Sequence, residues 1–418
     1  MNLLKSLTIE KIYLFYVILF AAQATLFTSD MDFRSNPIGV GLLILLCIRL
    51  LIKHKITLHN KNLLIIYLIL LLWATFHYLI DKEFKLLPYL ILFINVTIGY
   101  SLINIFGTKI YELTTKYITY LTGISIFLWA IMHITGTRFF ESISFMKPAS
   151  STSIASLLIF NIPNTDIYEG QGIGTLMRNC GFAWEPGLFA SFTCIAIYFN
   201  LIITKQIKKN WGFYILTIGL ISTFSTTGYC AFILILINYF ILQNRKKSHK
   251  YLFLILTIPL LSYVMGLSFM ADKIEKEDDN FMYNNNQLIR MAESEGNLIT
   301  VRRGEGIFLD YLNFQEKPIL GYGTGNNSYV SQHISPYIIS SNGITSTFAQ
   351  FGLILALLIN ITFILNSKYL DKLYGQKYCI FYILFMTLSI SYSFTTLALI
   401  IALCGGYLWI NQPKNIHK

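Results

Sequence analysis

The chain has 418 residues, of which 55% are hydrophobic and only 13% are charged, and its mean hydropathy is +0.57. Soluble globular domains carry about 25% charged residues, so this composition excludes a soluble cytoplasmic enzyme and predicts a single membrane domain over residues 1–418. The formal net charge of +11 does not indicate nucleic-acid binding, because the lysines and arginines are scattered between apolar runs and form no basic stripe.

Apolar runs long enough to cross about 30 Å of hydrocarbon recur along the chain. The first run follows a short segment with Lys5 and Lys11 and lacks a small-residue cleavage site after it, so we interpret it as a retained span. The last block, 378–410, exceeds one bilayer crossing as a helix and is divided near Ser393 into two spans. We therefore expect an all-α polytopic fold with about twelve transmembrane helices, at residues 12–27, 37–52, 63–80, 86–106, 117–135, 186–204, 212–224, 228–242, 251–270, 344–365, and on either side of 393 within 378–410.

Charges between the runs predict the orientation of the spans. With the N-terminus inside, the inner side receives 20 lysines and arginines against three acidic residues, and the outer side receives 12 against 18. This distribution follows the positive-inside rule and places both termini in the cytoplasm. Two segments on the outer side, 136–178 and 271–340, are too long to be simple connectors and are the expected places for function.

The first candidate site lies where the first long outer loop enters a span. Pro186 marks the first helical position, which places Glu185 at the outer mouth of the span, where the helix dipole favours a charged carboxylate. Arg178 is close enough in sequence to fold back on Glu185. A structural helix cap paired with an arginine is as good an interpretation as a cation and a carboxylate at the edge of an outward-facing cavity.

The short link 225–228, Ser-Thr-Thr-Gly, joins two spans on the same outer side. Its hydroxyls and glycine could bind a polar ligand, but the same residues form tight turns that satisfy their own backbone. We favour the turn.

The segment 301–318 predicts an interfacial amphipathic helix within the larger loop, ended by Pro318. Arg302 and Arg303 stand at its head, and the planar guanidinium fork suits a lipid-linked pyrophosphate at the membrane surface. Simple anchoring to lipid headgroups is the alternative. The apolar face carries residues 307, 308, 311, 312 and 314, and the other face carries Glu305, Asp310 and Glu316.

A glycine-rich run, Gly321-Tyr322-Gly323-Thr324-Gly325, follows this helix. Dinucleotide binding is rejected, because that motif requires a preceding strand in a βαβ unit. A glycine turn whose backbone amides approach an anion remains possible.

The order of these features resembles the O-antigen polymerase and ligase superfamily of bacterial envelope glycosyltransferases. The shared pattern comprises R-x-x-G…E-P at Arg178, Gly181, Glu185 and Pro186, a run from Arg303 through Pro318 to Gly321 and Gly323, and a polar start of the next span from Asn342. The match covers most of the chain as architecture: about twelve spans and two long periplasmic loops.

The sequence departs from this pattern at two places. The Ser-Arg-Thr-Gly often found at the short outer link reads Ser-Thr-Thr-Gly here, and Ser341 precedes Asn342 where ligases carry a histidine. The second departure favours a polymerase over a ligase, although His333 could substitute. A flippase of polysaccharide units is the non-enzyme alternative; such transporters usually show internal repeats and broken helices at the membrane midplane.

The resemblance implies an inner-membrane enzyme that transfers a growing glycan from undecaprenyl pyrophosphate onto the next lipid-linked repeat unit, with inversion and without a metal or other cofactor. Arg178, Arg303 and Arg302 would bind the pyrophosphate and stabilise its departing charge. Glu185 would serve as the base, and Gly321, Gly323 and Asn342 would contact substrate. The expected partners are the lipid-linked glycans, membrane lipid and a chain-length regulator protein.

Overall fold

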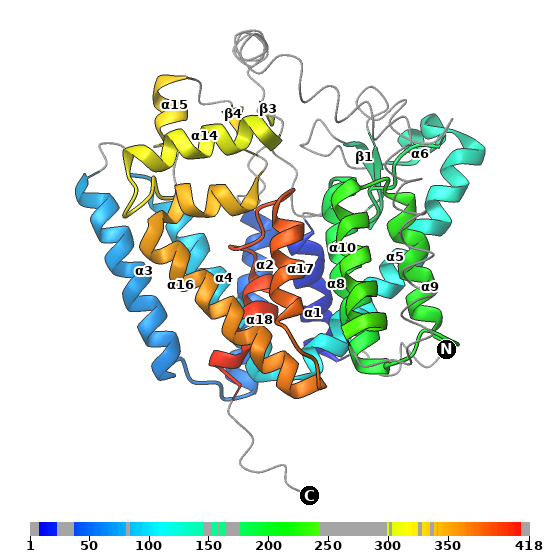
Figure 1. The fold of residues 1–418 in the computed structure, drawn as a ribbon, viewed down its shortest axis with the longest axis horizontal. Coiled ribbons are helices and arrows are strands. Elements are labelled where there is room, and N and C mark those ends of the chain that lie inside the picture. Colours follow the sequence, from blue (N-terminus) through cyan, green and yellow to red (C-terminus); the bar gives the residue numbers. More distant parts are fainter. Residues whose placement is uncertain are drawn as a thin grey trace, which may run out of the picture.

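The computed structural model describes residues 8–22, 37–80, 84–144, 153–157, 159–163, 176–242, 299–300, 303–324, 328–334, 338–340 and 342–410. These residues form a bundle of helices with four short strands (Figure 1). The helices are α1 Ile9–Ala21, α2 Pro37–Lys53, α3 Lys61–Ile80, α4 Leu86–Phe106, α5 Lys109–Thr135, α6 Thr137–Ile143, α8 Pro186–Thr204, α9 Trp211–Ser222, α10 Thr226–Ile237, α14 Arg303–Glu316, α15 Tyr329–His333, α16 Gly343–Tyr374, α17 Ile380–Ser389 and α18 Ala398–Gly405. A π-helical turn, η3 Asn238–Leu242, continues α10, a 3-10 turn, η4 Gly406–Leu408, follows α18, and the strands are β1 Ser153–Ser156, β2 Asn161–Pro163, β3 Ile299–Thr300 and β4 Ile338–Ile339.

The apolar runs of the sequence and the helices of the structure agree in position. Both α4 and α8 have the predicted bounds, and the last block divides into α17 and α18 on either side of Ser393. Five described helices are long and apolar enough to cross a membrane, namely α3, α4, α5, α8 and α16, and four shorter apolar helices accompany them. The expected span 251–270 and most of the loop 271–340 lie outside the described residues.

Helix α8 lies at the centre of one half of the bundle. It packs against α5, α9, α10 and α17, and its side chains are apolar or small on every face, so the whole helix can be buried. Its aromatic residues contribute much of the core; Phe189, Phe192 and Phe199 are fully buried. Pro186, with no amide hydrogen, occupies the first helical position and fixes where this central helix begins.

Helix α3 is the opposite case, a helix at the edge with most of its apolar side chains exposed. Leu68, Leu71 and Leu79 are each more than half exposed, as expected for side chains that face hydrocarbon. Near the end of this helix, Trp73 and His77 are buried and point away from that exposed face.

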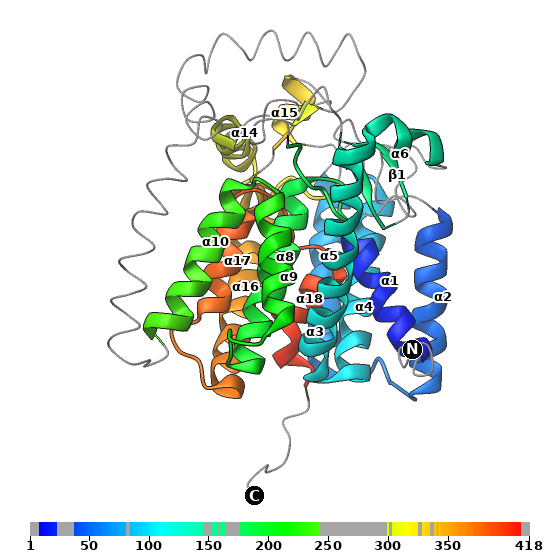
Figure 2. The ribbon, with the colours of Figure 1, turned by 90° about the vertical axis from the view of Figure 1, so that its right-hand side faces the viewer.

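Helices α6, α14 and α15 and the strand pairs gather at one end of the bundle (Figures 1 and 2). We name it the outer end, because the charge distribution predicts that it faces outward. Strands β1 and β2 pair antiparallel and pack with α6 around a small apolar cluster that includes Phe140 and Phe160. Strands β3 and β4 pair in parallel. The two long outer segments thus contain ordered structure that lies over the helix ends.

Helix α16 is broken at Gly352, which has a φ of +69° inside an otherwise helical segment. Figure 1 shows its first turns lying across the bundle and the remainder running along it. The expected span, 344–365, therefore contains this break, and the helical segment after Gly352 continues to Tyr374. Nothing in the apolar pattern marks this break, because tertiary contacts described below impose it.

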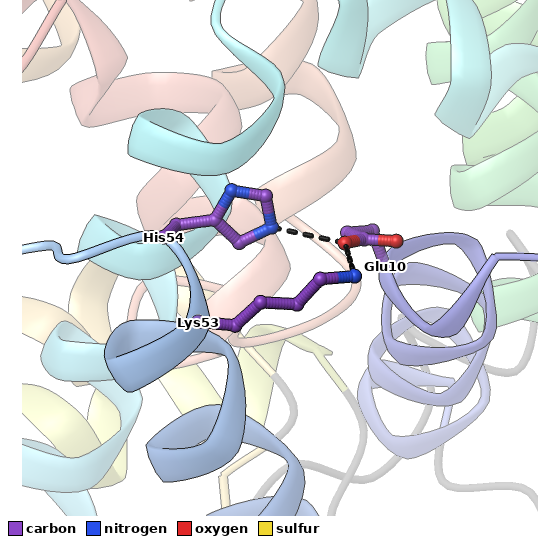
Figure 3. Close-up of polar contacts among 3 residues, drawn as sticks. All are labelled: Glu10, Lys53 and His54. Carbon is purple, nitrogen blue, oxygen red and sulfur yellow. Dashed lines mark hydrogen bonds and ion pairs between the residues drawn. The ribbon is translucent and has the colours of Figure 1, made fainter.

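At the opposite, inner end, the start of α1 meets the end of α2 (Figure 3). The Glu10 carboxylate accepts hydrogen bonds from Lys53 Nζ at 2.6 Å and lies 3.0 Å from His54 Nε2. This contact places the two charged helix ends on one side of the bundle, as the charge count predicts for the first two spans.

Candidate functional site

The segment that carries Arg178 is held at the outer end by helix α5. Trp129 Nε1 donates to Met177 O, and the Met177 amide donates to His133 Nε2, both at 2.9 Å. The Arg178 Nε in turn donates to Thr223 O at 3.0 Å, in the link between α9 and α10. Arg178 thus contacts Thr223, two residues before the Ser-Thr-Thr-Gly link 225–228, so these two sequence predictions lie close together.

The next residue, Asn179, explains why this segment is rigid. It is fully buried, its side-chain oxygen accepts from Ser125 Oγ and from the Gly181 amide, and its side-chain nitrogen donates to Ser222 Oγ. Gly181 has a φ of +57°, and an added Cβ would lie 2.7 Å from the Phe189 ring. In the R-x-x-G pattern, the arginine is thus followed by a turn in which only glycine fits at position 181.

Glu185 occupies the N-cap position of α8, as predicted, with extended backbone. Within the described residues its side chain does not cap the first amides of the helix, so the capping half of the structural interpretation is not observed. The preceding Trp184 donates from Nε1 to the Tyr392 hydroxyl at 3.2 Å, which ties this entry to the loop between α17 and α18.

The Ser-Thr-Thr-Gly link is a turn and a helix cap, as we favoured from the sequence. Ser225 Oγ accepts from the Gly228 amide at 3.3 Å and caps α10, while Phe224 adopts a φ of +47°. The Thr227 hydroxyl is hydrogen-bonded to the Ser391 hydroxyl. The link is thereby joined to the same α17–α18 loop that Trp184 contacts.

The start of α16 reaches this loop as well. Asn342 caps the helix, its Oδ1 accepting from the amides of Ile344 and Thr345 at 3.0 and 3.1 Å. Gly343 packs so closely on the loop that an added Cβ would lie 2.2 Å from Tyr392 O. The α17–α18 loop therefore contacts the entry of α8, the link before α10 and the start of α16.

Helix α14 lies across the outer end, and two of the three acidic residues opposite its apolar face are buried. Glu305 and Asp310 are 6% and 2% exposed, whereas Ile307, Phe308 and Tyr311 on the apolar face are more than 40% exposed. The reason is the contact of α14 with α16, which supplies hydroxyl partners for the polar face. The apolar face is left outward, as suits a helix beside hydrocarbon.

Asp310 is the centre of that contact. One of its oxygens, Oδ2, accepts from Ser340 Oγ at 2.7 Å and from Thr345 Oγ1 at 2.6 Å. Burial raises the pKa of the Asp310 carboxyl from 3.8 to about 7, against the opposite effect of these two hydrogen bonds. The carboxyl therefore joins α14 to the capped start of α16, next to Asn342.

The glycine-rich run fills the break in α16. The amides of Tyr322 and Gly323 donate to Ala349 O and Gln350 O, both at 3.0 Å, and the Leu353 amide donates to Pro318 O at 2.8 Å. Gly321 has a φ of +70°, and an added Cβ would lie 2.2 Å from Gln350 O and 2.5 Å from Gly352 N. Two backbones thus pass each other with no room for side chains.

These bonds bear on the expected anion site. The amides of Gly321, Tyr322 and Gly323 all donate to carbonyls of the protein, so in this structure they do not offer an amide nest to a phosphate. Arg303 is the first residue of α14, at the outer end, but its side chain lies outside what the structure describes, and Arg302 lies outside the described residues altogether. His333 ends α15, where its exposed ring stacks on Tyr329 at 4.4 Å between ring centroids.

A small cavity lies between α16 and α17, near the start of α16. Its volume is about 10 Å³, and Thr347, Phe385 and Ser389 are among the residues that line it. That is room for about one water molecule. Among the described residues, no three histidine, cysteine, aspartate or glutamate side chains gather as they would around a metal ion.

Three features of this end were not predicted from the sequence. Tyr392 and Ser391 stand in an apolar block where they looked like a simple boundary, and the burial of Asp310 was not foreseen. His77, 1% exposed, lies 3.3 Å from Leu320 O beside the glycine run, together with Trp73, which donates to the same carbonyl at 2.8 Å. A histidine and a tryptophan one turn apart near the end of an apolar run were the available signal for this contact.

Comparison with known proteins finds no match for this chain: no protein-family model, no curated protein and no solved structure is similar to it. The described fold and site thus define a helical protein with several helices able to span a membrane and with a polar cluster at one end of the bundle.

Proposed function

We propose that this chain is a membrane glycosyltransferase that joins oligosaccharide repeat units carried on undecaprenyl pyrophosphate, at the periplasmic face of the bacterial inner membrane. One observation carries the proposal. The sequence elements on which the resemblance depends extend from Arg178 to Asn342, 342 − 178 = 164 residues apart, and contacts through the α17–α18 loop and through Asp310 bring them to one end of the bundle.

In this proposal Arg178 binds the pyrophosphate of the donor. Its planar guanidinium matches the geometry of a phosphate, and the hydrogen bond from Nε to Thr223 O orients the side chain at the outer end. Arg303, at the head of α14, and Arg302 would supply the remaining positive charge. Their role is to stabilise the pyrophosphate as it leaves, which is electrostatic stabilisation of the transition state.

Glu185 is the residue we propose for accepting the proton of the attacking sugar hydroxyl. It stands at the mouth of α8, seven residues from Arg178 and next to Trp184. An aromatic ring beside a carboxylate is a common surface for a sugar, because the ring covers the apolar face of the pyranose. Asn342, Gly321 and Gly323 would shape the acceptor side through the start and the break of α16.

The structure also bears on the transporter alternative. A broken membrane helix such as α16 is typical of transporters, where the freed backbone groups bind substrate. Here the backbone groups that lose their helical partners near Gly352 are hydrogen-bonded to the segment 318–323. Ala349 O and Gln350 O accept from amides of the glycine-rich run, and the Leu353 amide donates to Pro318 O. This arrangement favours a structural joint over a translocation site.

Polymerase and ligase differ in what remains when the gene is deleted. Loss of a polymerase should abolish long chains but leave single repeat units attached to the final acceptor. Loss of a ligase should remove even the single-unit product. Gel analysis of the surface polysaccharide from the deletion strain decides between the two.

The site is tested by conservative replacement of its arginines. Arg178→Lys and Arg303→Lys keep the charge but lose the bidentate fork, so polymer formation should fall about a hundredfold, as for the loss of one transition-state donor of about 3 kcal/mol. The control is Arg138→Lys, an exposed arginine on α6 at the same end of the bundle, which should polymerise normally. Normal chains from both site variants, at wild-type protein level, would refute the proposal.

A further inference from the structure

A second concave surface lies at the inner end, remote from the residues discussed above. It is a groove of about 520 Å³ between the loop 205–210, which follows α8, and the turn η3 that ends the described part of α10. Lys205 and Lys208 line it together with Tyr214, Tyr239 and Phe240. The groove thus combines two cations with aromatic side chains.

The walls of the groove are fixed by hydrogen bonds. Asn210 Nδ2 donates to Thr204 Oγ1 at 3.0 Å and to Gln206 O at 2.9 Å, which closes the loop on itself. Across the groove, the Tyr239 hydroxyl donates to Lys205 O at 3.2 Å and joins η3 to the loop. The groove therefore exists before any ligand arrives.

The turn η3 is what opens the space. A π-helical turn is wider than an α-helical turn and is found frequently at functional sites. Its first residue, Asn238, is 2% exposed and donates to Gln376 Oε1 at 3.2 Å, so the widened turn is anchored to the α16–α17 connection. The wide turn directs Tyr239 and Phe240 toward the loop and leaves the groove between them.

Two exposed aromatic residues indicate the depth of the groove relative to a bilayer. Trp211 is 78% exposed and Tyr214 is 41% exposed, one turn apart at the start of α9. Tryptophan and tyrosine in such positions mark the boundary between hydrocarbon and headgroups. Tyr214 also lines the groove, so the groove opens at headgroup level.

We propose that this groove binds the phosphate headgroup of an anionic phospholipid of the inner leaflet. The ammonium groups of Lys205 and Lys208 supply the charge that a phosphodiester requires, and Tyr214 supplies a hydroxyl at the same depth. Ile207 and Phe240 give the groove an apolar side along which the first part of an acyl chain can lie. A free phosphate would use the lysines but not the apolar side.

The test uses the full-length protein in an uncharged detergent and measures its thermal unfolding midpoint during titration with phosphatidylglycerol. Phosphatidylglycerol should raise the midpoint, whereas phosphatidylcholine and inorganic phosphate at equal concentration should not. In the double variant Lys205→Gln/Lys208→Gln the apparent affinity for phosphatidylglycerol should fall about thirtyfold, because each lysine near an anionic surface contributes a factor of about five. The variant Lys205→Arg/Lys208→Arg should retain most of the affinity and shows that the loop still folds.

The matched control is Lys109→Gln/Lys116→Gln, which removes two exposed lysines from the same end of the bundle, on α5 and outside the groove. It should bind phosphatidylglycerol as the wild type does. An equal loss in this control would mean that general surface charge attracts the lipid, and would overturn the site. Equal stabilisation by inorganic phosphate would identify a soluble anion as the ligand and would overturn the lipid assignment.

Discussion

The outer and inner ends of the bundle use polar groups in opposite ways. At the outer end Asp310 and Asn342 are almost fully buried, and hydroxyls, amides and main-chain atoms hold them. At the inner end most of the described lysines are exposed, as with Lys53, whose side chain is 52% exposed in its pair with Glu10. The outer end is therefore a preorganised structure, and the inner end is a charged surface that solvent and ions can screen.

This difference separates two kinds of function. Catalysis requires polar groups in fixed positions, and holding them there requires burying them within the protein. Attraction to a charged bilayer surface requires only exposed cations at the level of the lipid headgroups. We expect substitutions at the outer end to have large, local and pH-dependent effects. Substitutions at the inner end should have small effects that depend on salt.

The largest effect is expected at the break in α16. Gly352→Ala forces a Cβ to within 2.2 Å of Ile319 O at a φ of +69°, so main-chain atoms of two segments must separate. We expect a loss of about 4 kcal/mol in the free energy of unfolding, seen as a lower thermal midpoint and less protein in the membrane.

Gly304→Ala is the control for that experiment. Gly304 lies in α14 at the same end of the bundle, and an added Cβ there meets no atom within 4 Å. Alanine favours a helix over glycine by about 1 kcal/mol, so this variant should be as stable as the wild type or slightly more stable. Equal destabilisation by the two substitutions would contradict a close backbone passage at Gly352.

A smaller effect, and one with a definite pH range, is expected at Asp310. The ordinary pKa of an aspartate carboxyl is 3.8, and burial raises the pKa of Asp310 in the folded protein to about 7. Between these two pH values the folded state holds a proton that the unfolded state has released. The contribution to stability is complete below pH 3.8 and is lost as the pH rises through about 7. The wild type should therefore lose about 2 kcal/mol relative to Asp310→Asn between pH 5 and pH 8.

The measurement is the thermal midpoint of both proteins across this pH range. Glu316→Gln provides the comparison, since Glu316 is an exposed carboxylate on the same helix. Its difference from the wild type should stay flat with pH. A flat difference for Asp310→Asn as well would mean that the carboxyl is ionised in the folded protein.

The smallest effect is expected at the inner ion pair. Glu10→Gln removes the contacts with Lys53 and His54, but exposed ion pairs contribute less than about 1 kcal/mol. The change in the thermal midpoint should be small in low salt and disappear in about 0.5 M salt, where charges are screened within a few ångströms. Glu112→Gln, an exposed acid near the start of α5, is the comparison, and an effect of Glu10→Gln that persists in high salt would contradict a screened surface pair.

Much of the helical framework could be predicted because it depends on local sequence. The bounds of α8 follow from Pro186 and the length of an apolar run, and the division of 378–410 follows from the limited thickness of a bilayer. The turn at Ser225 follows from residues that satisfy their own backbone. In each case the information lies within about twenty consecutive residues.

The features that escaped prediction depend on contacts between distant segments. Gly352 stands in an apolar run and breaks α16 because Gly321, 31 residues earlier, brings its backbone alongside. Asp310 is buried because Ser340 and Thr345 provide hydroxyls, and neither residue belongs to its own helix. Periodicity locates the face of a helix but does not say which neighbour that face will meet. Arg178, Glu185 and Asn342 could therefore be proposed singly, whereas the contacts of Trp184, Thr227 and Gly343 with the α17–α18 loop could not.

The joint between the glycine-rich run and α16 is made of main-chain atoms. Its hydrogen bonds join backbone amides to backbone carbonyls, so the side chains at 319, 320, 322 and 350 can change while the path of the chain is kept. Three glycines of the joint have a positive φ. Gly321 and Gly352 restrict each other by their proximity, and an added Cβ at Gly323 would lie 2.3 Å from the Tyr89 hydroxyl. A lineage of such proteins could therefore diversify the surface around this joint, and with it the ligand that is accepted, while the two glycines stay as a pair. Relatives with different neighbouring side chains but with both glycines present are the pattern that this geometry predicts.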